Sequence, residues 1–151
     1  MAALLEALMG LAAGSGHLRR RPGPRDPQMR QARVCYDHLA GEMGTAMFES
    51  MLARGVLARA GDGIALTGAG RDFVRDFLPD LIPGDLAAHS RAPLCRECLD
   101  WSERRSHLAG RLGRAMLARM IELGWARRQA DSRVIRFDRE GERRFQAMFS
   151  A

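Results

Sequence analysis

The sequence predicts an α+β fold that is mainly helical, with small β-hairpins, in which one structural unit occurs twice. Apolar residues make up 46% of the 151 residues, which is enough for one domain or two very small ones. Segments with helical spacing alternate with short segments that turn at glycine or aspartate. One stretch of sequence also recurs later in the chain, which indicates an internal repeat.

Residues 1–16 are predicted to form a short apolar helix. Leu4, Leu8 and Leu11 recur at helical spacing, and Glu6 is the only charged residue among them. The segment is too short to cross a membrane and lacks the basic start of a signal peptide. An apolar helix at a chain end needs a partner to cover it, either the body of its own chain or a second subunit.

Residues 17–33 are predicted to be a linker rich in arginine and proline. The stretch RRRPGPRDP shows no periodicity, and helical spacing returns only at Met29. Two copies of the repeated unit follow, which divide the rest of the chain into residues 34–84 and residues 85–151.

The two copies share a register that chance does not explain. The sequence His-Leu-Ala-Gly begins at His38 and again at His107, 69 positions later. The motif Cys-x-Asp precedes each copy, at Cys35 and at Cys98, and it stands further from the histidine in the second copy. The residues that match after the glycine are Gly44, Ala46, Met47, Met51 and Gly55 in the first copy, and Gly113, Ala115, Met116, Met120 and Gly124 in the second.

Each copy is predicted to contain a helix, a hairpin and a second helix. The first helix includes the Leu-Ala-Gly segment and ends at Gly55 or Gly124. The hairpin of the first copy turns at Asp62-Gly63. The second helix begins after a capping side chain, Thr67 or Asp138, and carries a pair of phenylalanines on one face. This order of elements is that of a winged helix, so the fold is two tandem winged-helix-like repeats behind an N-terminal helix.

A DNA-reading winged helix needs a turn and a separate recognition helix. The spacing from Gly44 to Gly55, and from Gly113 to Gly124, leaves room for one helix only. Base-specific reading by this chain is therefore not expected. The formal net charge is +6, all basic residues are arginine, and the second copy is the more basic of the two. Nonspecific contact with the DNA backbone remains an alternative, through Arg104, Arg105, Arg111 and Arg114.

Four segments carry a resemblance to a known family: VCYDHLAGEMGTAM, LTGAGRDF, CLDWSERRSHLAGRLGRAML and ELGWARR. They resemble the C-terminal half of a class of ArsR-type helix-turn-helix transcriptional regulators, and the resemblance covers residues 2–149. It implies a cytoplasmic, homodimeric regulator in which the N-terminal helix is the dimerisation helix. It also implies that DNA is read by a winged-helix domain absent from this chain.

Three cysteines are too few for a disulfide framework, and their odd number predicts a reducing compartment. Thiol and imidazole ligands suit a zinc-like or thiophilic ion, and the resemblance to ArsR-type regulators favours metal or metalloid sensing. A structural role for these residues and a redox thiol switch are the alternatives. The candidate ligands are Cys35, His38, Cys95, Cys98 and His107.

No catalytic motif is present in the sequence, so the chain is not expected to be an enzyme. The predicted function is the effector-sensing and dimerising part of an ArsR-like regulator; the alternatives are direct DNA binding by the second repeat and sensing through the cysteines. A small effector could bind between the two repeats. The residues expected to form either its pocket or the core are Trp101, Trp125, Met47 and Met116.

Overall fold

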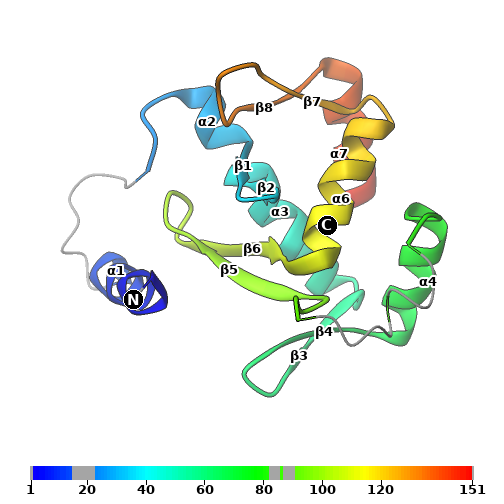
Figure 1. Cartoon of the computed structure of the whole chain (residues 1–151), viewed down its shortest axis with the longest axis horizontal. Helices are drawn as coiled ribbons and strands as arrows, with labels where there is room; N and C mark the ends of the chain where they lie inside the picture. The colour runs from blue at the N-terminus through cyan, green and yellow to red at the C-terminus, as the bar shows by residue number, and fades with distance from the viewer. Residues whose placement is uncertain (1, 15–22, 82–85, 87–90, 151) are drawn as a thin grey trace.

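The computed structural model describes residues 2–14, 23–81, 86 and 91–150, and it confirms the predicted α+β fold. These residues form six helices and four two-stranded antiparallel hairpins (Figure 1). The helices are α1 (Ala2–Gly14), α2 (Pro27–Gln31), α3 (Gly41–Ala53), α4 (Gly68–Phe77), α6 (Gly110–Glu122) and α7 (Arg139–Phe149). The hairpins are β1 (Arg33–Cys35) with β2 (His38–Ala40), β3 (Leu57–Ala60) with β4 (Gly63–Leu66), β5 (Arg96–Asp100) with β6 (Arg105–Ala109), and β7 (Ala126–Arg128) with β8 (Ile135–Phe137).

The order hairpin, helix, hairpin, helix occurs twice, from β1 to α4 and from β5 to α7. The expectation that Leu-Ala-Gly is helical was wrong for its leucine and alanine, which together with the preceding histidine lie in strands β2 and β6. Each helix starts only at the following glycine, Gly41 or Gly110, where φ is +85° or +83°. A Cβ atom at either glycine would lie 2.6–2.8 Å from a backbone carbonyl, so only glycine fits this change from strand to helix.

Other local predictions agree with the structure, with one exception. Gly55 and Gly124 follow α3 and α6 with positive φ, as expected for residues that end helices. The hydroxyl of Thr67 and the carboxylate of Asp138 accept hydrogen bonds from the third residue of α4 and α7. The exception is the turn between β3 and β4. It lies at Gly61-Asp62 instead of Asp62-Gly63, because Gly63 pairs with Ala60 in the ladder.

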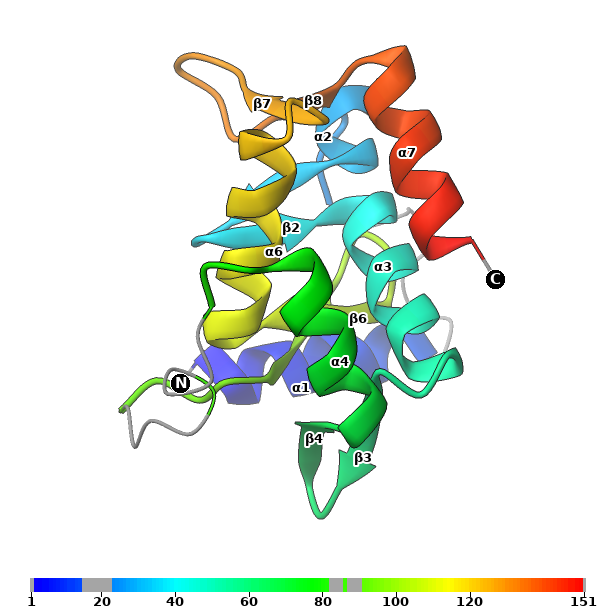
Figure 2. The ribbon, with the colours of Figure 1, turned by 90° about the vertical axis from the view of Figure 1, so that its right-hand side faces the viewer.

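The two repeats are interlocked and share one hydrophobic core. Helix α3 packs against β6 and α7 of the second repeat, and α6 packs against β2 of the first. The rings of Phe77 in α4 and Trp125 after α6 are in contact, and Phe73 of α4 contacts Phe149 of α7. Figure 2 shows α6 and α3 apart from each other, with β2 between them. The core therefore cannot be assigned to either repeat alone.

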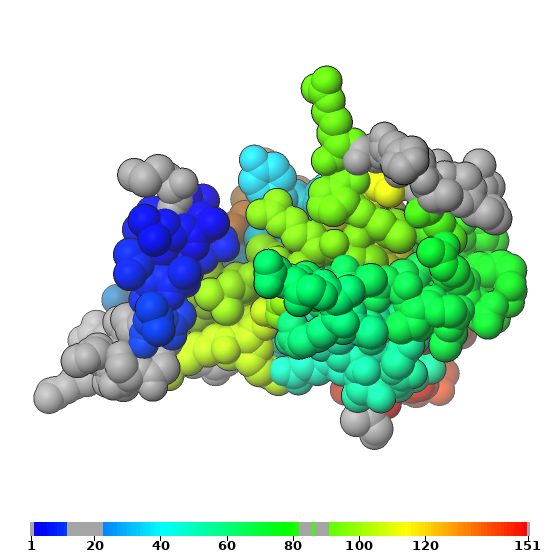
Figure 3. All heavy atoms as spheres, turned by 90° about the horizontal axis from the view of Figure 1, so that it is seen from below, coloured from blue at the N-terminus to red at the C-terminus, as the bar shows by residue number. Residues whose placement is uncertain are grey.

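Helix α1 lies at one end of the molecule, as Figure 3 shows, with Gly10 beside Leu99 of β5. Its predicted helical structure is confirmed, and Leu4, Leu8 and Leu11 are each more than half exposed. The described end of the predicted linker contains α2, which includes Met29, and the carboxylate of Asp26 caps its first turn.

No helix in the described part of the chain is long and apolar enough to cross a membrane.

Candidate metal centre

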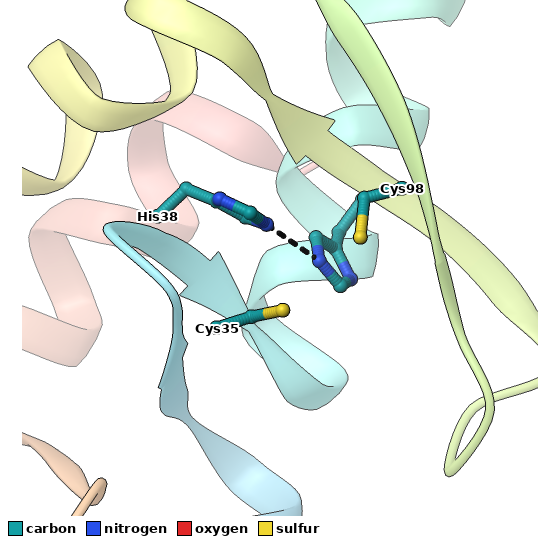
Figure 4. A group of neighbouring side chains, drawn as sticks. Cys35, His38 and Cys98 are labelled. Carbon is teal, nitrogen blue, oxygen red and sulfur yellow. Dashed lines mark hydrogen bonds between the residues drawn. The ribbon is translucent and has the colours of Figure 1, made fainter. Parts of the chain in front are cut away.

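Four side chains from the two repeats meet at the point where hairpins β1–β2 and β5–β6 face each other. They are Cys35 and His38 of the first hairpin and Cys98 and His107 of the second. One ligand atom from each lies within 4.8 Å of the other three. Figure 4 shows the side chains of Cys35, His38 and Cys98 directed towards a common centre. Both histidines are buried and both cysteines are half-buried.

The ladder register places a cysteine opposite a histidine in both hairpins. Cys35 pairs with His38 across β1 and β2, and Cys98 pairs with His107 across β5 and β6. The second hairpin is longer, which explains why the Cys-x-Asp motif stands further from the histidine in the second copy. Its extra residues extend the strands and the turn beyond the Cys–His pair, and the pair itself is unchanged.

The two histidines face each other across the repeat boundary. Their Nε2 atoms are 3.0 Å apart, a distance at which one ring donates a hydrogen bond to the other. A glycine of the opposite helix lies behind each ring. A Cβ at Gly44 of α3 would lie 3.6 Å from the Cβ of His107, and one at Gly113 of α6 would lie 3.3 Å from that of His38. The contacts that exclude a side chain are with the preceding strand, because the same Cβ atoms would lie 2.5 Å from the carbonyl oxygens of Leu39 and Leu108.

Each histidine has a carboxylate beside its second ring nitrogen. Asp37 Oδ1 lies 3.2 Å from Nδ1 of His38, and Asp100 Oδ2 lies 3.2 Å from Nδ1 of His107. The contact to Asp100 does not have the geometry of a hydrogen bond, and it is an ion pair only when His107 is protonated. Carboxylates in this position fix ring orientation and leave Nε2 as the ligand atom of metal-binding histidines. Both Nε2 atoms here point inwards, so the donor set fits a metal ion.

The two carboxylates differ in their surroundings. The side chain of Asp37 is half exposed, whereas that of Asp100 is fully buried. Asp100 accepts hydrogen bonds from the Gly41 amide at 2.7 Å, from Arg33 Nη2 at 2.9 Å and from Ser102 Oγ at 2.8 Å. Burial alone would raise the pKa of Asp100. The contact with His107, these hydrogen bonds and the charge of Arg33 instead hold it well below its usual range.

The two thiols of the centre are electrostatically unequal. Hydrogen bonding from the Cys98 thiol, and from the rings of His107 and His38, lowers the pKa of Cys35. The hydrogen bond to Cys35 and burial raise the pKa of Cys98. Burial would lower the pKa of His107, but Asp100 and Cys35 raise it. These contacts favour a thiolate at Cys35 and a thiol at Cys98, and a cation bound by both sulfurs would displace the proton of Cys98.

The fifth candidate ligand, Cys95, lies apart from this group. It precedes β5, and burial raises the pKa of its thiol to about 11. Although Cys95 and Cys98 are separated by only two residues, Cys98 alone belongs to the group. The pair that shares the site is Cys35 and Cys98, which are brought together only by the packing of the two repeats.

The four candidate DNA-contacting arginines fall into two places. Arg104 and Arg105 lie at the turn and start of β6, where Arg105 forms an ion pair with Glu49 of α3 at 2.7 Å. Arg111 and Arg114 lie in the first turns of α6, and Arg111 donates a hydrogen bond to the carbonyl of Ala92.

The four residues proposed for an effector pocket lie in two different surroundings. Met47 and Met116 are fully buried in the shared core, and Trp125 packs there against Phe77. Trp101 is half exposed at the tip of hairpin β5–β6. Three of the four therefore have the core role that was their alternative interpretation.

Comparison with known proteins gives one informative similarity. No family model and no solved structure matches the chain. The chain is 39% identical over 115 residues to a protein of Bacillus subtilis (strain 168) named as the uncharacterized HTH-type transcriptional regulator YdfF. The chain is thus related to a transcriptional regulator. The match covers 76% of this chain and 50% of the relative, so the chain spans about half the length of the curated relative it matches.

All four residues of the group lie in the recurring Cys-x-Asp and His-Leu-Ala-Gly motifs, but the sequence does not show what surrounds them. The recurrence of Asp37 and Asp100 was visible, whereas nothing in the sequence shows that only Asp100 becomes buried. Arg33 gave no signal, because it is one of six arginines in the predicted linker. In the structure it is 6% exposed and paired with Asp100.

Proposed function

We propose that this chain is the effector-sensing and dimerising part of an ArsR-like transcriptional regulator, and that it is not an enzyme. The identity to a named HTH-type regulator supports the regulatory role. In this proposal a domain outside this chain reads the operator, as the single helix between Gly44 and Gly55 has no room for a reading element. The exposed leucines of α1 would pair with those of a second copy.

The effector that the site favours is a thiophilic divalent ion of the zinc type. The observation that carries this choice is the meeting of two thiols and two inward-facing Nε2 atoms within 4.8 Å. Two cysteines and two histidines are a common tetrahedral zinc set, and soft ligands disfavour Mg²⁺ or Ca²⁺. Asp37 and Asp100 would orient the two rings around such an ion.

The proposed site also has a position suited to regulation. Two of its ligands come from β1–β2 and two from β5–β6, so an ion would join the two repeats. Each of these hairpins contacts the long helix of the other repeat. An ion would favour the arrangement in which both hairpins are drawn together, and the regulator would respond through that shift in population.

Metal content and thiol protection test this proposal. Protein purified under reducing conditions without chelator is expected to hold about one zinc-like ion per chain. Cys35 and Cys98 would resist alkylation until a chelator is added. Cys98→Ser is expected to lose the ion, whereas Cys95→Ser, which removes the thiol outside the centre, is the matched control and keeps it.

Absence of bound metal, together with no tight uptake of Zn²⁺ by the reduced protein, would contradict the metal role.

Dimerisation is measured separately by light scattering during gel filtration. Leu4→Glu combined with Leu8→Glu is expected to give monomers, because both side chains are exposed on α1. A dimer that survives these changes would place the subunit interface elsewhere.

A further inference from the structure

We propose that Cys35 and Cys98 are also a modification site: without metal, a hydroperoxide oxidises them to a reversible disulfide that joins the two repeats. This inference adds a covalent state to the site described above. The disulfide itself does not depend on metal binding. Only its competition with metal rests on the proposed function.

The geometry of the sulfur atoms carries this inference. The two Sγ atoms belong to the group whose members all lie within 4.8 Å of one another, and they come from strands of different repeats. A disulfide bond needs about 2.05 Å between the two sulfur atoms. The side chains of Cys35 and Cys98 must therefore rotate to bring their sulfur atoms closer together. The third thiol, Cys95, is outside this group although it is only three residues from Cys98.

Two cavities make the thiols accessible. One, of about 560 Å³, is lined by Cys35 and Cys98 together with Arg96 and Arg114. Another, of about 390 Å³, is lined by Cys35 and His107 on a different side of the centre. Both cysteines are only half-buried. A small peroxide can therefore reach the sulfur of Cys35 without opening the core.

The reaction balances with one hydroperoxide per disulfide. The Cys35 thiolate attacks the terminal peroxide oxygen, the O–O bond breaks, and the alkoxide or hydroxide that leaves takes a proton to become alcohol or water. The sulfenic acid formed at Cys35 is then attacked by the sulfur of Cys98. The S–O bond breaks, and the hydroxide that leaves becomes water with the proton from Cys98. The two thiols lose two electrons and the peroxide gains them.

Oxidation and metal binding exclude each other in this scheme. Both use the same two sulfurs, and a sulfur in a disulfide is no longer a thiolate ligand. Peroxide would therefore expel the ion, and the ion would protect the thiols. The centre would therefore respond to two signals, which are the concentration of a thiophilic ion and the presence of peroxide.

Peptide mapping tests the disulfide directly, because trypsin places the three cysteines on separate peptides. These are residues 34–54 with Cys35, residues 92–96 with Cys95 and residues 97–104 with Cys98. The reduced, chelator-treated full chain is exposed to hydrogen peroxide at a small molar excess, alkylated and digested without reductant. The expected product links peptides 34–54 and 97–104 within one chain, leaves Cys95 alkylated, and reverts with dithiothreitol.

Variants and metal loading complete the test. Cys98→Ser is expected to stop at a sulfenic acid on Cys35, which dimedone labels, while the matched control Cys95→Ser still forms the disulfide. Loading one Zn²⁺ per chain is expected to slow the reaction at least about tenfold, since the sulfur lone pairs are engaged in metal bonds. A chromogenic chelator would record Zn²⁺ release as the disulfide forms.

Three results would overturn the inference. They are disulfides that involve Cys95 as often as Cys98, disulfides only between chains, and three unmodified thiols after peroxide. A chain that binds Zn²⁺ but forms no disulfide would reject this inference alone. A chain that forms the disulfide but takes up no metal would reject the metal role alone. Equal oxidation rates with and without Zn²⁺ would reject the competition.

Discussion

The carboxylate of Asp100 connects three parts of the molecule at the residue scale. Its oxygens contact the ring of His107, the first amide of α3 and the guanidinium of Arg33, all away from solvent. A buried carboxylate in such a network stabilises the fold only while its partners remain, because removal of one partner leaves a buried charge. The side chain of its counterpart Asp37 is half exposed. The two histidines of a nearly symmetric centre therefore have carboxylate partners that differ in burial.

Asp100→Asn is expected to weaken Zn²⁺ binding about 10- to 100-fold, the range seen when a carboxylate behind a metal-bound histidine is removed. Asp37→Asn is the matched control and should weaken it less, because its side chain is half exposed. Competition titration against a chelator of known affinity measures both. Equal effects of the two variants would show that burial of Asp100 plays no part in metal binding.

The repeated glycines of α3 and α6 give a second prediction at this scale. A Cβ at Gly44 or Gly113 would lie 2.5 Å from the carbonyl oxygen of Leu39 or Leu108. Gly44→Ala and Gly113→Ala should each lower the free energy of unfolding by about 1–3 kcal/mol, the usual cost of overpacking. Gly68→Ala is the control, because a Cβ there meets no atom within 4 Å. Urea unfolding measures all three, and an unchanged Gly113→Ala would contradict the close contact.

At the scale of elements, the hairpins differ in length while the helices that follow them match. Hairpin β1–β2 has three residues per strand and turns directly after Cys35, with Tyr36 fully exposed at φ +61°. Hairpin β5–β6 has five residues per strand, and its extension carries Asp100 towards α3. The longer hairpin thus supplies the buried support that the shorter one lacks.

The caps of α4 and α7 are a prediction at the scale of elements. Thr67→Ala and Asp138→Ala remove hydrogen bonds to the amides of Gly70 and Gly141. Each is expected to lower the free energy of unfolding by about 1 kcal/mol. Thr67→Ser and Asp138→Asn keep an accepting oxygen and should recover most of that loss. Chemical denaturation measures the four variants; no recovery in the conservative pair would mean that the caps do not stabilise these helices.

At the scale of the whole molecule, the two repeats pack against each other through their hairpins and helices and do not form two separate units. Arg59 of β3 pairs with Glu97 of β5 at 3.0 Å, and the amide of Val34 in β1 donates to the carbonyl of Arg133 near β8. The hairpins and helices of each repeat thus provide packing and hydrogen-bond partners for the other repeat. This arrangement puts a site shared by both repeats at the centre of the fold.

Separated repeats test this interlocking. A fragment of residues 24–81 and one of residues 91–150 should each lack cooperative unfolding alone, since each exposes half of the shared core. Mixed together, they should recover helical circular dichroism and a cooperative transition. Independent folding of either fragment would show that a single repeat is a sufficient core.

Binding to DNA is the remaining prediction for the whole molecule. The net charge is +6, but Arg105 is paired with Glu49, and the four candidate arginines lie in two places. The chain alone should bind duplex DNA weakly, without preference for sequence, and lose that binding steeply as salt rises. Electrophoretic shifts at two salt concentrations measure this. A sequence-specific shift that resists salt would show that the chain reads bases itself.

The sequence by itself determined the local structure and the internal symmetry. Glycines ended α3 and α6, capping residues began α4 and α7, and the register of the repeat placed equivalent residues in equivalent elements. These features follow from the conformational preferences of a few neighbouring residues, which the sequence states directly. The same signals did not reveal that His-Leu-Ala is a strand, because three residues carry too little periodicity to separate a strand from a helix.

Only the tertiary structure decided which of the five candidate ligands share a site. The sequence offered all five without separating them, whereas packing brought Cys35 to Cys98 and left Cys95 aside. It also decided that Asp100 is buried and Asp37 is not. The physical reason is that hairpins of different repeats meet through long-range packing of α3 and α6, and contacts between distant segments are not encoded in local spacing.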